Sequence, residues 1–229
     1  MAPLESVDSG SIEWRHSLRL ESWFHRRRMP VYLDRIAAFH RAGRPTSTRL
    51  LRRMQIAWGN SSYSGSREFL ATMLWLLKST DGPVLECGSG LSTLIICATL
   101  DAERSLVTLE HQHKWRNLVS SNERVLSRSN VSIIDAPLVS YGEYSWYEID
   151  PAQLPLNFGL VVCDGPPGDT PGGRYGLVPV LKSHLQPGAI ILLDDIQRES
   201  EQHVSRRWIE ELPAEVIEES ETCLVLKVR

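Results

Sequence analysis

The chain has 229 residues, of which 42% are hydrophobic and 23% charged, and its formal net charge is −3. This length suits one α/β domain with an extension, and the ordinary composition excludes a disordered or fibrous protein. No apolar run approaches the length of a membrane-spanning helix, so the sequence predicts no membrane partner.

The cysteines and the first residues indicate the compartment. The four cysteines (Cys87, Cys97, Cys163 and Cys223) form no CxxC pair. Three of them lie in apolar runs, where reduced cysteine behaves as a small hydrophobic residue. The first ten residues lack the basic and then apolar pattern of a signal peptide. We therefore expect a cytoplasmic protein with no disulfide framework and no zinc site.

Positive charge is concentrated in the N-terminal part. Residues 1–60 carry 11 arginines against 5 acidic residues, a net charge of +6, and the remainder carries −9. Such a segment can bind nucleic acid or an acidic partner. Here the arginines are interleaved with Trp14, Leu18 and Trp23 at helical spacing, and no nucleic-acid-binding signature accompanies them. We expect a helical face without a nucleic-acid partner, and a homodimer contact through these helices.

The first quarter of the chain has a helical pattern. It runs from Ser11 to about Met54, with predicted breaks at Met29-Pro30 and at 43–47. Ser47 or Thr48 can cap the following helix. The sequence thus predicts a helical cap over residues 1–57. A second unit, residues 58–229, begins with a loose connection over 58–66 and an apolar helix over 67–79.

Beyond Gly82 the pattern alternates between strand and helix. Predicted strands are 83–87, 105–110, 131–135, 158–164 and 188–195, and predicted helices are 91–101, 113–127, 174–185 and 196–211. Several strands are continuous aliphatic runs, which is typical of a parallel sheet covered on both faces. Residues 214–220 and 221–229 predict a closing hairpin. The pattern indicates an α/β fold with a doubly wound sheet.

Each of these five strands ends in an acidic residue. The acids are Glu86, Glu110, Asp135, Asp164 and the pair Asp194-Asp195. A single acid after a strand is ordinarily a turn former or a helix cap. Ligands of doubly wound sheets, however, bind outside the carboxyl ends of the strands. Acids gathered on that edge therefore indicate a functional site.

The loop after the first strand has the glycines of a ligand-binding turn. Gly88 and Gly90 allow the backbone to approach a ligand, and Ser92 and Thr93 supply donors at the start of the next helix. Glu110 follows Gly90 by 20 residues, the spacing at which an acid binds the ribose hydroxyls of an adenosine. The sequence predicts an adenosine-containing ligand.

The same loop distinguishes among such ligands. Thr93 stands where a dinucleotide-binding fingerprint has its third small residue, and no P-loop G-K-[ST] sequence is present. Glu86, just before the turn, would repel a pyrophosphate but suits an ammonium group. S-adenosyl-L-methionine combines an ammonium group and an adenosine and has no phosphate.

From about Tyr63 onward the chain resembles class I S-adenosylmethionine-dependent methyltransferases, including a bacterial subgroup with ECGSGxST and DGPPG motifs. The matching segments are 84-VLECGSGLST-93, 107-VTLEH-111, 133-IIDAPL-138, 159-GLVVCDGPPG-168 and 187-PGAIILLDD-195. The resemblance implies a Rossmann-like, seven-stranded sheet whose last strand runs antiparallel, with S-adenosyl-L-methionine as cofactor. It implies a cofactor site made of Tyr63 and Ser64 at the methionine carboxylate, Glu86, Gly88, Ser89 and Gly90 around the methionine end, Glu110 at the ribose, and Asp135 and Ala136 beside the adenine, completed by Ser92, Thr93, His111 and Asp164.

Asp164, Asp194 and Asp195 resemble the strand-end ligands of catechol, caffeoyl-CoA and macrolide-sugar O-methyltransferases. Those enzymes hold one magnesium or calcium ion there, and three carboxylates repel one another unless a hard cation or a proton intervenes. The alternative is that Asp194 caps the next helix while Asp195 pairs with Arg198 or Arg174. A site with Mg2+ or another divalent cation and a site without metal both remain open. Without metal, Asp164 is the first candidate for a general base and His111 the second.

The acceptor end is predicted from the proline-rich loop 165–176 and the aromatic segment 141–151. Arg174, Tyr175 and Tyr147 are the candidate substrate residues. A structural ion pair of Arg174 with an aspartate is an equal alternative to substrate binding.

Three functions follow from these residues. The first is methyl transfer to a small-molecule acceptor, favouring a hydroxyl such as that of a sugar or another natural product. The second is a non-catalytic or regulatory protein that binds an adenosine ligand on the same fold. The third is an NAD(P)-linked oxidoreductase, against which Thr93 and the lack of a catalytic Tyr-x-x-x-Lys count.

Overall fold

The computed structural model describes residues 9–59 and 63–229, and for residues 9–23 it describes the helical backbone alone. Residues 60–62 of the predicted connection lie outside the described residues. Seven strands form one sheet in the order β3-β2-β1-β6-β7-β9-β8. Their bounds are Val84–Cys87 (β1), Leu106–Glu110 (β2), Val131–Asp135 (β3), Phe158–Cys163 (β6), Leu185–Asp194 (β7), Ala214–Glu219 (β8) and Cys223–Val228 (β9).

The sheet confirms the predicted fold. β1 pairs in parallel with β2 and β6, β2 with β3, and β6 with β7, whereas β9, the last strand, is antiparallel to both of its neighbours. Four of the five parallel strands have few or no exposed residues because helices cover both faces. The register sets Glu110 beside Asp135, and Cys87 beside both Leu109 and Cys163. The carboxyl ends of these strands therefore meet along one edge.

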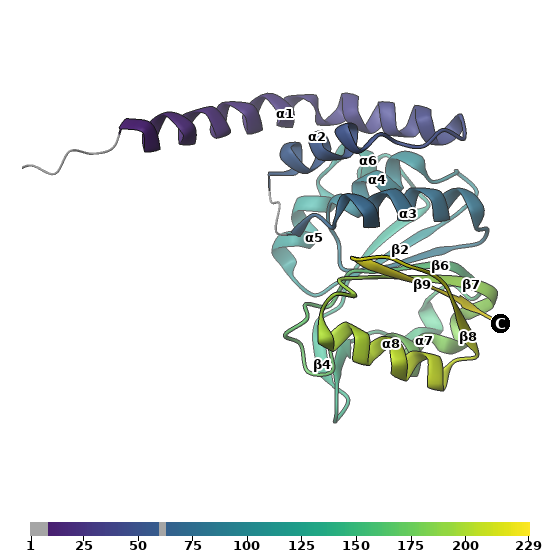
Figure 1. Cartoon of the computed structure of the whole chain (residues 1–229). Helices are drawn as coiled ribbons and strands as arrows, with labels where there is room; N and C mark the ends of the chain where they lie inside the picture. Colours follow the sequence, from purple (N-terminus) through teal and green to yellow (C-terminus); the bar gives the residue numbers. More distant parts are fainter. Residues whose placement is uncertain (1–8, 60–62) are drawn as a thin grey trace, which may run out of the picture.

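Two layers of helices enclose the sheet, as Figure 1 shows. On one face lie α1 (Ser9–Arg41), α2 (Thr48–Trp58), α3 (Arg67–Ser79) and α4 (Leu91–Thr99), and on the other lie α7 (Leu177–Leu181) and α8 (Glu199–Glu211). Leu33 of α1 and Leu51 of α2 belong to the same buried cluster as Val84 of β1. The N-terminal helices thus share a hydrophobic core with the sheet.

Strand alternation divides the core between these layers. Val84 faces the cluster under α1–α4, whereas Leu85 and Cys87 face the cluster under α7 and α8. Glu86, two residues after Val84, therefore points toward the α4 face. This direction decides its role at the site.

The N-terminal helix differs from its prediction. α1 continues through Pro30, where the sequence predicted a break. Proline removes one helical hydrogen bond, but Tyr32, Leu33 and Ile36 beyond it are all buried in the core. Burial of that apolar face outweighs the missing bond, because packing supplies most of the stability of a protein helix. The predicted cap of α2 is confirmed: the Ser47 side chain accepts from the backbone N–H of Leu50.

Other boundaries differ more locally. The predicted helix 113–127 divides into α5 (His113–Ser120) and α6 (Glu123–Leu126), because the Asn122 side chain accepts from the Arg124 N–H and starts a new helix. The predicted helix 174–185 is a short α7 followed by a single 3-10 turn (Lys182–His184). A two-stranded hairpin of β4 (Leu138–Ser140) and β5 (Ser145–Tyr147) occupies the segment that the sequence predicted only as aromatic.

Within residues 9–59 and 63–229, no helix combines the length and apolar character that a membrane span requires.

Candidate active site

A cavity of about 690 Å³ opens along the carboxyl edge of the parallel strands. The loops after β1, β2, β6 and β7 form its floor, and α2, the start of α3 and the turn before β9 contribute to its rim. Its lining includes nine predicted cofactor residues: Tyr63, Ser64, Gly88, Ser89, Gly90, Ser92, Glu110, His111 and Asp164. The structure therefore brings together most residues that the sequence singled out.

Glu110 ties the glycine loop to the end of β2. Its Oε2 accepts hydrogen bonds from the backbone N–H of Ser89 at 2.8 Å and from the Ser89 hydroxyl at 2.8 Å. Its Oε1 accepts from the backbone N–H of Gln112 at 2.7 Å. The Nδ1 atom of His111 lies 3.4 Å from the same Oε1. Glu110 is thus a carboxylate held in place on the cavity wall by these hydrogen bonds.

Glu86 lies beneath the loop, which differs from its predicted place at the ligand. Its Oε2 accepts from the hydroxyls of Thr93 at 2.7 Å and Thr108 at 2.8 Å, and the Thr93 hydroxyl accepts from the Gly90 N–H at 2.9 Å. Glu86 is fully buried and is absent from the described lining of the cavity. Thr93, in the place of the third glycine, connects the buried acid to the loop. Glu86 therefore supports the loop from below and does not line the described cavity.

Burial raises the pKa of Glu86 to about 7, and hydrogen bonds from its hydroxyl neighbours only partly offset this rise. The folded protein therefore binds a proton at Glu86 more readily than the unfolded chain, in which this side chain has its ordinary pKa of 4.5. It follows that the free energy of unfolding decreases as the pH rises from about 4.5 to about 7, by up to about 3 kcal/mol.

Glu86→Gln is expected to remove this pH dependence. The free energy of unfolding of the variant minus that of the wild type should be larger at about pH 8 than at about pH 5. The reason is that the wild type must bury an ionised carboxylate at the higher pH, whereas glutamine carries no charge. Chemical denaturation at both pH values measures the difference. Glu219→Gln, at an exposed position of β8, is the control and shows no such trend. A stability difference between Glu86→Gln and wild type that is equal at both pH values contradicts the expectation.

Two residues predicted beside the adenine lie outside the cavity lining. Asp135 pairs with His113 (Oδ2 to Nδ1, 3.3 Å), and Ala136 is buried in the core. Conversely, the cavity is also lined by Gln55, Gln112 and Trp115, which were not predicted as site residues. Trp115 stacks on Trp58 with ring centroids 5.9 Å apart and contacts Tyr63 at 5.8 Å. No sequence signal separates this tryptophan from an ordinary helix residue.

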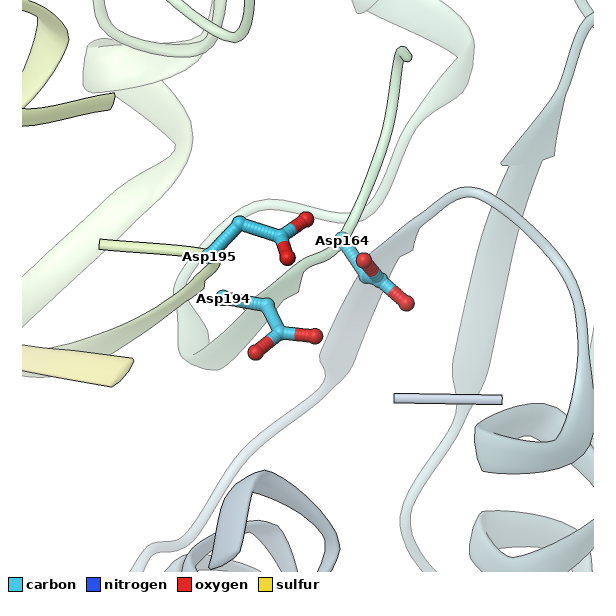
Figure 2. A group of neighbouring side chains, drawn as sticks. All are labelled: Asp164, Asp194 and Asp195. Atoms are coloured by element: carbon cyan, nitrogen blue, oxygen red, sulfur yellow. The ribbon is translucent and has the colours of Figure 1, made fainter. Parts of the chain in front are cut away.

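Three acids meet where β6 and β7 end. One carboxylate oxygen from each of Asp164, Asp194 and Asp195 lies within 4.8 Å of the other two. Figure 2 shows the three side chains around a common space. Asp195 adopts φ of +61°, a left-handed conformation that aspartate tolerates better than most residues. The predicted capping role of Asp194 is wrong, because α8 begins later, with Arg198 at its N-cap.

Arg174 crosses the cluster from the loop before α7. Its Nη2 donates to Oδ1 of Asp164 at 3.2 Å and to Oδ2 of Asp195 at 2.9 Å. Nη1 of Arg198 reaches the same Asp195 oxygen at 2.8 Å. Asp195 therefore pairs with both arginines, as the alternative interpretation of the sequence predicted.

Two of the three acids, Asp164 and Asp194, have raised pKa values. Burial, followed by neighbouring negative charge, raises the pKa of Asp194 to about 8. Burial also raises the pKa of Asp164 to about 6, against the opposing effect of the Arg174 charge. Both carboxyl groups therefore bind a proton more readily than an exposed aspartate does.

The two predicted substrate tyrosines lie apart. Tyr147 lines the cavity, and its fully buried hydroxyl has no hydrogen-bond partner among the residues that the structure describes. A Cβ built on Gly165 would lie 2.5 Å from that hydroxyl, so it sits against the loop after β6. Tyr175 instead donates its hydroxyl to Glu211 of α8 and is absent from the described lining of the cavity. Its predicted contact with the substrate does not fit this position.

The acid cluster fits a divalent cation in ligand type but not in charge. Carboxylate oxygens are the ligands that Mg2+ and Ca2+ prefer. In this cluster Arg174 already holds one oxygen of Asp164, and Arg174 and Arg198 together hold one of Asp195. The positive charge that such a cation would supply is present on the two guanidinium groups.

Residues 85–196 match a protein family described as "Methyltransferase domain". The matched residues run from β1 to the turn after β7 and so contain the glycine loop, Glu110 and the acid cluster. No curated protein matches the chain.

Solved structures show where the fold recurs. An O-methyltransferase from Bacillus cereus, in complex with SAH, is 16% identical and has a TM-score of 0.54 over 81% of this chain and 92% of that chain. TomG from Streptomyces achromogenes, an O-methyltransferase involved in tomaymycin synthesis and in complex with SAM, is 14% identical with a TM-score of 0.53 over 84% and 95%. A precorrin-6y C5,15-methyltransferase from Geobacter metallireducens GS-15 is 13% identical with a TM-score of 0.53 over 74% and 95%. At these identities the likeness shows a Rossmann-like methyltransferase fold.

Proposed function

We propose that this chain is an S-adenosyl-L-methionine-dependent methyltransferase that transfers the methyl group to a hydroxyl of a small-molecule acceptor. The observation that carries the proposal is the pairing, across one cavity, of a carboxylate-anchored glycine loop with a cluster of proton-accepting acids. The family match over residues 85–196 and the fold support it. Two of the structural neighbours are O-methyltransferases, which favours oxygen as the acceptor atom.

The cofactor would lie along the strand ends. Glu110 is placed to accept the ribose hydroxyls, and Gly88 and Gly90 to let the backbone approach the methionine end. Ser64, which is buried on the cavity wall, suits the methionine carboxylate. The Tyr147 hydroxyl would gain a partner from the bound ligand, because an unpaired buried hydroxyl is costly.

When bound, S-adenosyl-L-methionine supplies an electrophilic methyl group on a sulfonium centre. Asp164 accepts the proton of the acceptor hydroxyl, and the freed oxygen can then form its bond to carbon while the carbon–sulfur bond breaks. S-adenosylhomocysteine, the methylated acceptor and a protonated carboxyl are the products. Buried Arg174 holds Asp164 in place through its side chain and its backbone carbonyl, the latter at 2.8 Å. His111 remains the second candidate base.

Two alternatives remain distinguishable. An NAD(P)-linked oxidoreductase needs space for a pyrophosphate at the start of α4, where Thr93 is buried and bonded to Glu86. A non-catalytic adenosine-binding protein would share the cofactor contacts but would not depend on the acid cluster. Variants at Glu110 and at Asp164 therefore separate binding from turnover.

Glu110→Gln is expected to weaken the binding of S-adenosylhomocysteine about tenfold or more, because charge-assisted hydrogen bonds to this carboxylate are lost and one amide N–H would face a backbone donor. Isothermal calorimetry measures the affinity. Asp135→Asn is the matched control, since this acid ends the neighbouring strand but is not among the described lining residues. Equal affinity of Glu110→Gln and wild type would contradict the assignment.

We also propose that the N-terminal helices form the contact of a homodimer in the cytoplasm and bind no nucleic acid. Figure 1 supports this in part, because α1 extends beyond the helical layer that covers the sheet. Sedimentation of the full chain measures the oligomeric state, and a monomer at all concentrations contradicts the dimer.

A further inference from the structure

Arg174 is held by the ends of both strands that carry the acid cluster. Besides the two carboxylates, its Nη2 donates to the backbone carbonyl of Asp164 at 2.8 Å and its Nη1 to that of Asp194 at 2.6 Å. The side chain is 1% exposed. The guanidinium group is therefore built into the fold and cannot turn into solvent when another cation approaches.

These contacts occupy one carboxylate oxygen each of Asp164 and Asp195 and bring positive charge to the place where a metal ion would bind. Asp164 and Asp195 each give one oxygen to Nη2 of Arg174, and the Asp195 oxygen also takes Nη1 of Arg198. A divalent ion between the same carboxylates would be repelled by both guanidinium groups in a partly buried site, where screening by water is weak.

We propose that Arg174 is the resident cation of the acid cluster, so that the wild-type site functions without a divalent metal ion and Arg174 acts as a positioning residue for Asp164. The cation-binding part of this inference is independent of the proposed function, whereas the positioning part rests on it. Arg198, whose side chain is 48% exposed, contributes a weaker share of the charge.

Manganese titration followed by electron paramagnetic resonance tests the inference on the full chain. Wild type is expected to bind Mn2+ only weakly, and Arg174→Met at least about tenfold more tightly, because one positive charge leaves while an unbranched side chain still fills the inner part of the space. Arg198→Gln is expected to show a smaller increase. Arg206→Gln, at an exposed position of α8, is the matched control and leaves the titration unchanged.

Arg198→Gln keeps the test decisive if Arg174→Met does not fold, because Arg198 lies at the surface. Tight Mn2+ binding by wild type that neither variant strengthens would overturn the proposal, as would loss of turnover in EDTA with recovery on adding Mg2+. Titration of the same preparations with S-adenosylhomocysteine tests the proposed methyltransferase function separately from the role of Arg174 as the resident cation. A failure to bind this ligand tells against the proposed function and leaves the manganese result valid.

Discussion

Asp164→Asn is expected to lower methyl transfer by a factor of about 10² to 10⁴, the usual contribution of a positioned general base. Asparagine keeps an oxygen for Arg174 and the backbone contact of residue 164, so the cluster should retain its shape. It cannot accept the hydroxyl proton. S-adenosylhomocysteine affinity should stay within a few-fold of wild type, because the loss concerns the chemical step.

The release of S-adenosylhomocysteine with a panel of hydroxylated small molecules measures this effect. Asp169→Asn is the matched control: this aspartate belongs to the same loop and lines the same cavity, but it is exposed and has no ion pair with the cluster among the described residues. Turnover of Asp164→Asn at the wild-type rate would exclude Asp164 as the base and would favour His111.

Alanine substitutions at the two glycines of the loop, Gly88 and Gly90, are expected to have different effects on stability and on cofactor binding. Gly88 has φ of +88°, and a Cβ there would lie 3.3 Å from the backbone of Gly165 on the neighbouring strand end. Gly88→Ala should therefore lose about 1–3 kcal/mol of stability together with cofactor binding. Gly90 has extended backbone, and no atom of the described residues lies within 4 Å of a Cβ built on it. Gly90→Ala should fold as wild type.

A defect of Gly90→Ala would then be seen only with ligand present. If the cofactor passes close to this backbone, the added methyl group should weaken S-adenosylhomocysteine binding about tenfold, which matches the lower part of the 1–3 kcal/mol that overpacking costs. Thermal unfolding without ligand and calorimetry with ligand separate the two glycines. Normal binding by Gly90→Ala would place the ligand elsewhere in the cavity.

The sequence predicted the sheet, and the edge along which the acids gather, because both depend on local patterns. Continuous aliphatic runs specify buried parallel strands, and the acids that follow them meet by topology alone. The direction of the Glu86 side chain could also have been inferred from the sequence. Residues of a strand alternate between its two faces, so Glu86 shares the face of Val84 and lies below α4. The Thr93 bridge to that acid depends on tertiary contacts and could not be predicted from spacing.

The loop between β6 and α7 was the least predictable part of the site. Arg174 and Tyr175 are adjacent in sequence, yet one enters the acid cluster and the other turns to Glu211 on α8. Their directions depend on a turn in which Gly172 and Gly173 both have positive φ and on contacts with residues far along the chain. The helix around Pro30 was mispredicted for a similar reason. A proline ordinarily indicates a helix break, but packing of the residues beyond Pro30 in the core keeps α1 continuous.

The central claim is that the cavity is built for S-adenosyl-L-methionine, and calorimetric titration of the wild-type chain with S-adenosylhomocysteine and, separately, with NAD tests it most directly. Saturable binding of S-adenosylhomocysteine, weakened in Glu110→Gln, together with no detectable binding of NAD, is the predicted result. Binding of NAD without binding of S-adenosylhomocysteine would contradict the account.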